Sequence, residues 1–175
     1  VYLVVWRGDD DTAPLVDDAW EIFGQLLTAA GTETGTNDFR ISDMGATDGT
    51  DDFEASAPNA AYNATNNLYL VVWYGDDDTA PQVDGETEIF FQVVAGATGA
   101  EVGPDERISD MGIGGDAASD TYEPDVAWNS TDNEFLVVWY GIEDVAPLID
   151  GEQEIFSQRL DGAAVPIKVS GYLVD

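Results

Sequence analysis

Carboxylates at repeated spacing are the side chains of this sequence best suited to chemistry. The stretch GDDDTAP at residues 8–14 recurs at residues 75–81 and, altered to GIEDVAP, at residues 141–147. Further acids follow each copy. Carboxylates held this close raise one another's pKa unless a cation lies among them. The three acidic loops are therefore candidate cation sites.

Calcium is the cation that these loops predict, because it takes about six to eight oxygen ligands from carboxylates and backbone carbonyls. The chain has no histidine and no cysteine to offer zinc or copper. The spacing differs from that of an EF-hand, which needs a glycine and a glutamate at fixed loop positions. A solvated acidic turn, shaped by aspartate hydrogen bonds and the Ala-Pro pair, is the alternative. The predicted calcium ligands are Asp9, Asp11, Asp17, Asp76, Asp78, Asp84, Asp144 and Asp150.

An internal repeat places the acidic loops. The run YLVVW at residues 2–6 recurs at residues 69–73 and, as FLVVW, at residues 135–139. The triplet EIF follows each run at the same offset, and RISDMG at residues 40–45 recurs at residues 107–112. Internal repeats indicate one structural unit per copy. The sequence therefore divides into units at residues 1–57, 58–123 and 124–175.

Each unit contains short runs of β-branched and aromatic residues between turn residues, and no segment keeps a helical period. This pattern predicts an all-β fold of antiparallel, four-stranded, propeller-like blades in tandem, about three units, the first lacking its first strand. An incomplete blade leaves a strand edge to be covered or paired. Residues 171–175, GYLVD, echo the start of the chain. They either add a strand to the incomplete unit, in the same chain or a neighbour, or merely extend the last strand.

Several motifs occur together in nearly the whole chain, among them PNAAYN at residues 58–63 and the YLVVW, EIF and RIS runs. In this combination the sequence resembles the long tandem repeats of large secreted bacterial proteins. The resemblance implies propeller-like blades in an extracellular or cell-surface protein, and it carries no activity to this chain. The chain holds fewer units than such repeats form, so it is either a complete subunit or part of a longer array.

The charge of the chain excludes some partners. Its 36 acidic and five basic side chains give a net charge of −31, which repels nucleic acid and anionic membranes. No apolar run reaches the length of a membrane-spanning helix, so we expect no membrane insertion. Such a surface needs counter-charge from salt, divalent cations or a basic partner.

Other repeated side chains have structural interpretations. Trp6, Trp73 and Trp139 are predicted core residues, with a sugar-stacking platform as the alternative. A glutamine that recurs in the third strand of each unit is expected to satisfy neighbouring backbone groups. Asn63 and Asn129 match the glycosylation acceptor pattern but fit hairpin turns equally well. The repeated glutamines are Gln25, Gln92 and Gln158.

The predicted function is that of an extracellular structural or adhesive protein. It self-assembles through open blade edges, as a filament or a closed oligomer, and calcium stabilises it. A glycan-binding module, whose repeated loops act by avidity, is the alternative. We expect no enzyme, because every acidic cluster belongs to the repeat whereas an active site usually breaks it, although a glycosidase-type carboxylate pair stays open.

Overall fold

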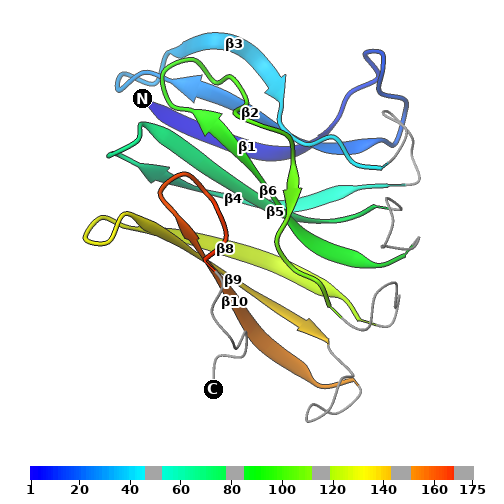
Figure 1. Cartoon of the computed structure of the whole chain (residues 1–175). Coiled ribbons are helices and arrows are strands. Elements are labelled where there is room, and N and C mark those ends of the chain that lie inside the picture. The colour runs from blue at the N-terminus through cyan, green and yellow to red at the C-terminus, as the bar shows by residue number, and fades with distance from the viewer. Residues whose placement is uncertain (46–52, 78–84, 112–118, 143–150, 168–175) are drawn as a thin grey trace.

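The computed structural model of the chain describes residues 1–45, 53–77, 85–111, 119–142 and 151–167. These residues form ten strands and no helix. The strands make three antiparallel sheets that follow one another in chain order, from β1 to β10 (Figure 1). The prediction of an all-β fold of tandem, propeller-like blades is confirmed.

The strand order within the sheets is β1-β2-β3, β4-β5-β6-β7 and β10-β9-β8. The first sheet contains β1 (Tyr2–Asp9), β2 (Trp20–Leu27) and β3 (Glu33–Arg40). The second contains β4 (Ala55–Asn63), β5 (Leu68–Asp76), β6 (Thr87–Ala95) and β7 (Glu106–Arg107). The third contains β8 (Thr121–Asn129), β9 (Glu134–Ile142) and β10 (Gln153–Asp161). Among the described residues, the first sheet thus has no counterpart of the strand that β4 and β8 supply to the other two.

The hairpins form where the sequence offers turn residues. Asn67 and Asn133 adopt left-handed backbone conformations, with φ of 55° and 56°, which asparagine tolerates better than most residues. Asn63 Oδ1 accepts hydrogen bonds from the backbone N–H groups of Thr65 and Asn66, at 2.9 and 3.0 Å. The asparagine-rich segment between β4 and β5 therefore fixes the register of that hairpin.

The first strands begin slightly earlier than the repeat predicts. β4 starts at Ala55 and β8 at Thr121, three residues ahead of the unit boundaries expected at 58 and 124. In both strands the register then shifts across a bulge. At the bulges, Ala57 and Glu123 have positive φ of 48° and 46°. The bulge allows each strand to pair with its neighbour on both sides of the irregular segment.

The sheets pack face to face, and each sheet has two faces. We call the face toward the preceding sheet the N-face and the face toward the following sheet the C-face. For the first sheet, the N-face is the side away from the second sheet; for the third, the C-face is the side away from the second. Side chains of β5 alternate between the two faces, as the pleat of a strand requires.

Two hydrophobic cores result from this alternation. Tyr69, Val71 and Trp73 on the N-face of the second sheet pack with Ile22 and Leu26 of the first. The second core joins the C-face of the second sheet to the N-face of the third; it includes Leu70, Val72, Ile89, Phe135, Val137 and Trp139. This explains why β5 and β6 are apolar on both faces. No helix that could cross a membrane occurs among the described residues.

Candidate functional site

The first acidic loop connects β1 to β2 and gathers three of the predicted calcium ligands. One carboxylate oxygen from each of Asp9, Asp11 and Asp17 lies within 4.8 Å of the others, and all three side chains are exposed. Hard carboxylate oxygens in this arrangement suit calcium. The structure therefore brings together the ligands that the repeat spacing selected in the first unit.

Local contacts hold this loop in shape. Asp10 Oδ1 accepts a hydrogen bond from the N–H of Thr12 at 2.8 Å, and the N–H of Leu15 donates to the Thr12 carbonyl at 3.1 Å. Leu15 and Ala19 are buried against Phe23. The apolar side chains in the middle of the loop thus anchor it to the sheet, which leaves the carboxylates at its surface.

The charges of the loop act on one another. Repulsion from Asp17 raises the pKa of Asp11, with smaller contributions from desolvation and from Asp9. Hydrogen bonds from Thr12 lower the pKa of Asp10. A cation among these groups would relieve the repulsion. The carboxylates of the loop therefore repel one another in the absence of a counter-charge.

The other two acidic loops are only partly described. At the end of β5, Asp76 Oδ2 accepts a hydrogen bond from the N–H of Gly85 at 2.9 Å. The remaining predicted ligands, Asp78, Asp84, Asp144 and Asp150, lie outside the described residues. Calcium binding by these loops stays a prediction.

Gly75 near the end of β5 and Gly141 near the end of β9 precede the second and third acidic loops, and the backbone of another segment approaches each of them closely. A Cβ atom on Gly75 would lie 2.8 Å from the carbonyl oxygen of Glu54. A Cβ atom on Gly141 would lie 2.8 Å from the carbonyl oxygen of Asp120. Any side chain would therefore force the strand apart from the segment that leads into the blade.

A second set of acids is buried, and its role was not recognised from the sequence. Glu88 in β6 is fully buried. It accepts hydrogen bonds from the Ser109 hydroxyl and from the Met111 N–H, the latter at 2.8 Å. Arg107 Nη1 lies 3.3 Å from Glu88 Oε1. The Ser109 hydroxyl oxygen in turn accepts from the N–H of Ile89 at 2.6 Å. We call this arrangement the glutamate latch.

The first sheet contains the same latch. Glu21, 3% exposed, accepts hydrogen bonds from the Ser42 hydroxyl and from the Met44 N–H. Arg40 Nη1 lies 3.8 Å from Glu21 Oε1. Glutamate and serine are 21 residues apart in both sheets. This constant spacing between the EIF and RIS motifs is the signal that could have revealed the pairing.

Burial raises the pKa of both latch glutamates to about 7, although the hydrogen bonds and the neighbouring arginines act in the opposite direction. In the first sheet the latch ties the segment after β3 to β2, and in the second sheet it ties the segment after β7 to β6. We therefore interpret these glutamates as structural.

The repeated glutamines serve as predicted. Gln92 Nε2 donates to the carbonyl oxygens of Val93 and Gly103, at 3.2 and 3.0 Å. Gln25 and Gln158 make the corresponding pairs of bonds in their sheets. The glutamine side chain thus satisfies backbone groups at the point where the third strand meets the segment beyond it.

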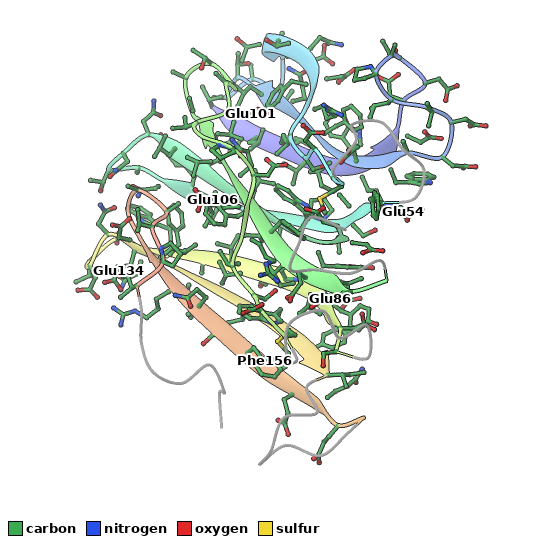
Figure 2. All side chains as sticks on the ribbon, turned by 45° about the vertical axis from the view of Figure 1, so that its right-hand side comes forward. Glu54, Glu86, Glu101, Glu106, Glu134 and Phe156 are labelled. Carbon is green, nitrogen blue, oxygen red and sulfur yellow. The ribbon has the colours of Figure 1, made fainter. Side chains whose placement is uncertain are left out.

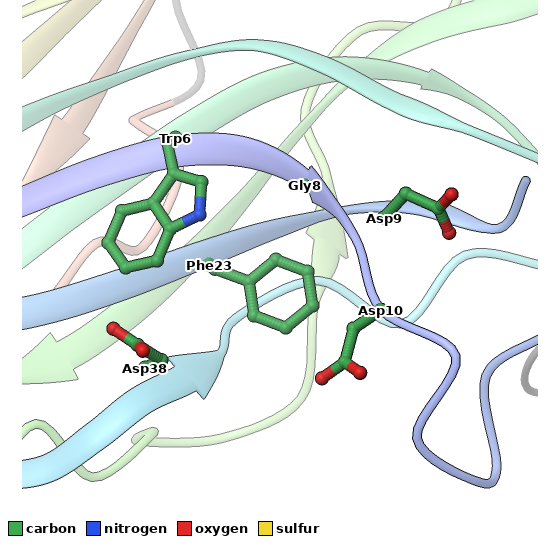
Figure 3. Close-up of a pocket in the computed structure, with 6 residues that line it drawn as sticks. All are labelled: Trp6, Gly8, Asp9, Asp10, Phe23 and Asp38. Carbon is green, nitrogen blue, oxygen red and sulfur yellow. The ribbon is translucent and has the colours of Figure 1, made fainter.

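An aromatic pocket opens on the N-face of the first sheet. The rings of Trp6 and Phe23 stack with centroids 6.3 Å apart, beside Asp10 and Asp38 (Figure 3). The same Trp-Phe pair occurs in the second and third sheets at 6.4 and 6.2 Å. There the tryptophans Trp73 and Trp139 are buried against the preceding sheet. The core prediction is confirmed for these two, whereas Trp6 is half-buried.

A further acidic pocket lies between the first and second sheets, and no sequence pattern indicated it. Its lining includes Arg40, Asp43, Glu101 and Asp105. Asp105 Oδ2 accepts a hydrogen bond from the N–H of Asp43 at 2.8 Å. Burial raises the pKa of Asp105 to about 7. The pocket therefore joins two neighbouring blades through an acid that is partly protonated near neutral pH.

Fold and site together define a class: an all-β protein of tandem, propeller-like blades with acidic loops between the strands. No family model and no curated protein matches the chain. A solved structure titled "Crystal structure of a thermostable family-43 glycoside hydrolase" is similar to it, with a TM-score of 0.48 and 13% identity. The match covers 99% of this chain and 57% of that protein, so the chain spans a little over half of its length. We assign no activity from it.

Proposed function

We propose that the chain is an extracellular structural or adhesive β-repeat protein that self-assembles through the open edge of its first blade. The observation that supports this proposal is the edge of β1. In the second and third sheets the corresponding strands, β5 and β9, pair with β4 and β8. Among the described residues, β1 pairs only with β2. The extracellular location rests on the resemblance to secreted bacterial repeats.

An unpaired edge of this length favours strand addition. β1 spans eight residues, and each unpaired strand edge presents a row of backbone donors and acceptors. Tyr2 and Val4 beside it are 62% and 44% exposed. A strand that added here would complete the hydrogen-bond ladder and cover apolar surface at the same time.

A second copy of the chain is the partner that we propose for this edge. Residues 171–175, which lie outside the described residues, have the sequence GYLVD, which echoes the YLV of residues 2–4 in β1. Assembly then leads to a filament if the contacts do not close and to a ring if they do.

The test compares the full chain with a chain that ends at residue 170, by light scattering after size-exclusion chromatography. Strand addition by the tail predicts that the full chain has a larger mass than one copy and that the shortened chain does not. A full chain that elutes as one copy at every concentration would exclude the proposal. Equal oligomers from both chains would exclude the tail as the added strand.

We also propose that calcium stabilises the first acidic loop. The support for this is the convergence of Asp9, Asp11 and Asp17 on an anchored loop. Calcium would reduce the repulsion within the loop and part of the net charge of −31, which otherwise opposes association between copies.

A glycan-binding function is the second candidate. It draws support from the aromatic pocket, where the half-buried Trp6 lies beside the carboxylates of Asp10 and Asp38. Tryptophan faces and carboxylates are suited to stack against a sugar ring and to accept its hydroxyl hydrogens. Binding on a glycan array that Trp6→Ala abolishes would support this function, and an array without any bound glycan would exclude it.

A further inference from the structure

The C-face of the third sheet exposes the side chains that the second sheet buries. On the second sheet, Leu70 and Ile89 of the C-face are 0% exposed because the third sheet covers them. Their counterparts in the repeat, Leu136 and Ile155, are 42% and 49% exposed. The same pattern of residues therefore leaves an open apolar surface on this face of the third sheet.

The N-face of the first sheet is open in the same way. Tyr69 and Val71 on the N-face of the second sheet are 6% and 0% exposed, because the first sheet covers them. Their counterparts Tyr2 and Val4 are 62% and 44% exposed. The N-face of the first sheet and the C-face of the third thus each carry one half of an interface that already occurs between the described sheets.

The interior interfaces show how the two halves fit. β8 lies against β4, β5 and β6, so that the N-face of one sheet packs on the C-face of the sheet before it. Asn63, fully buried, donates to Asn133 Oδ1 and to the Gly162 carbonyl of the next sheet, at 2.9 and 3.2 Å. Its counterpart Asn129 is exposed and donates to Asp132 in its own turn, at 2.8 Å. The third sheet therefore retains a polar group at the place where a following blade would receive it.

We propose that a second copy of this chain docks head to tail, so that the C-face of the third sheet packs on the N-face of the partner's first sheet. The proposal rests on the proposed self-assembly and adds a second surface to the β1 edge, formed by the N-face of the first sheet and the C-face of the third. The two faces differ from each other and match as the interior faces match, which makes the contact heterologous. Two copies of three sheets give six blades, within the range of about four to eight at which propellers close.

The test uses one arginine on each face. Val4→Arg changes the N-face, Leu136→Arg changes the C-face, and Val102→Arg changes an exposed valine of the segment between β6 and β7. Each variant lowers the net negative charge by the same amount, so general electrostatics would favour association in all three. Circular dichroism and thermal unfolding verify that each variant folds, and sedimentation velocity gives the mass.

Head-to-tail docking predicts a specific pattern of masses. Val102→Arg is a dimer like the unmodified chain, and Val4→Arg and Leu136→Arg are each monomers. An equimolar mixture of Val4→Arg and Leu136→Arg forms a dimer but no larger particle, because each variant still offers one intact face.

Other patterns of masses would overturn head-to-tail docking, and they distinguish its failure from a failure of the proposed self-assembly. If both face variants stay oligomeric, the two faces do not carry the assembly, and the β1 edge remains its proposed surface. If only one of them dissociates, the contact pairs identical faces. If the unmodified chain is itself a monomer, the self-assembly fails as well, and a further repeat of the same kind becomes the expected occupant of both faces.

Discussion

The stability of the folded chain depends on the protonation of the two latch glutamates, Glu21 and Glu88. Glu88 is fully buried beside Arg107, and its pKa is raised from 4.5 to about 7 by burial. A carboxyl group with a raised folded-state pKa binds its proton more tightly in the folded chain than in the unfolded chain. Its contribution to stability is therefore complete below pH 4.5 and is lost as the pH rises to about 7.

Glu88→Gln should flatten this dependence. The free energy of unfolding of the unmodified chain, measured with urea, is expected to fall between about pH 5 and pH 7.5, by about 1 to 3 kcal/mol for each latch glutamate. Glutamine keeps the size of the side chain without its titration. Exposed Glu106→Gln serves as the control. The same slope in Glu88→Gln as in the unmodified chain would mean that the glutamate does not titrate in this range.

Asp11 is the residue whose removal most directly tests the calcium site. One of its carboxylate oxygens lies within 4.8 Å of an oxygen of Asp9 and of one of Asp17, so Asp11→Asn should weaken calcium binding in a calorimetric titration by at least about tenfold. Exposed Glu33→Gln in β3 carries the same charge change away from the loop and should leave the affinity unchanged. Equal affinities in the two variants would show that the loop is only a solvated turn.

At the scale of elements, the turns between strands join one blade to the next. Asn63 and Asn129 hold their own turns in the same way, since each accepts from the N–H two residues further on at 2.9 Å. Only Asn63 also donates to the following sheet. The pair therefore separates the contribution of the turn from that of the contact between blades.

Asn63→Ala should cost more than Asn129→Ala. Loss of the buried bonds leaves Asn133 Oδ1 and the Gly162 carbonyl with fewer donors, which predicts about 1 to 3 kcal/mol of additional destabilisation. Chemical denaturation of the two variants measures the difference. A difference near zero would show that the contact between blades adds nothing to stability.

The sequence predicts the strands and turns well, but it predicts poorly which side chains contact one another across them. Short runs of β-branched and aromatic residues and asparagine turns suffice to place β5 and its hairpin, because those signals are local. The glutamine contacts were also predictable, since they join neighbouring strands. The latch, the Asn63 contact and the pocket at Asp105 were not, because their partners lie 21 to 99 residues away and are brought together only by sheet packing.

For the whole molecule, charge and apolar surface act in opposite directions. Carboxylates lie around the second and third sheets: Glu54 precedes β4, Glu101 lies between β6 and β7, and Glu134 begins β9 (Figure 2). The net charge of −31 opposes association. The end faces favour association through Tyr2, Val4, Leu136 and Ile155. Salt near physiological strength screens charges beyond about 8 Å but leaves apolar burial intact. We therefore expect assembly to strengthen with ionic strength.

Sedimentation equilibrium of the unmodified chain, at physiological salt with calcium, tests the central claim most directly. The claim is that a second copy completes the row of blades. It predicts a particle of twice the 18.8 kDa of one chain, and calcium chelation should weaken it. A mass of 18.8 kDa at every protein concentration would contradict the claim.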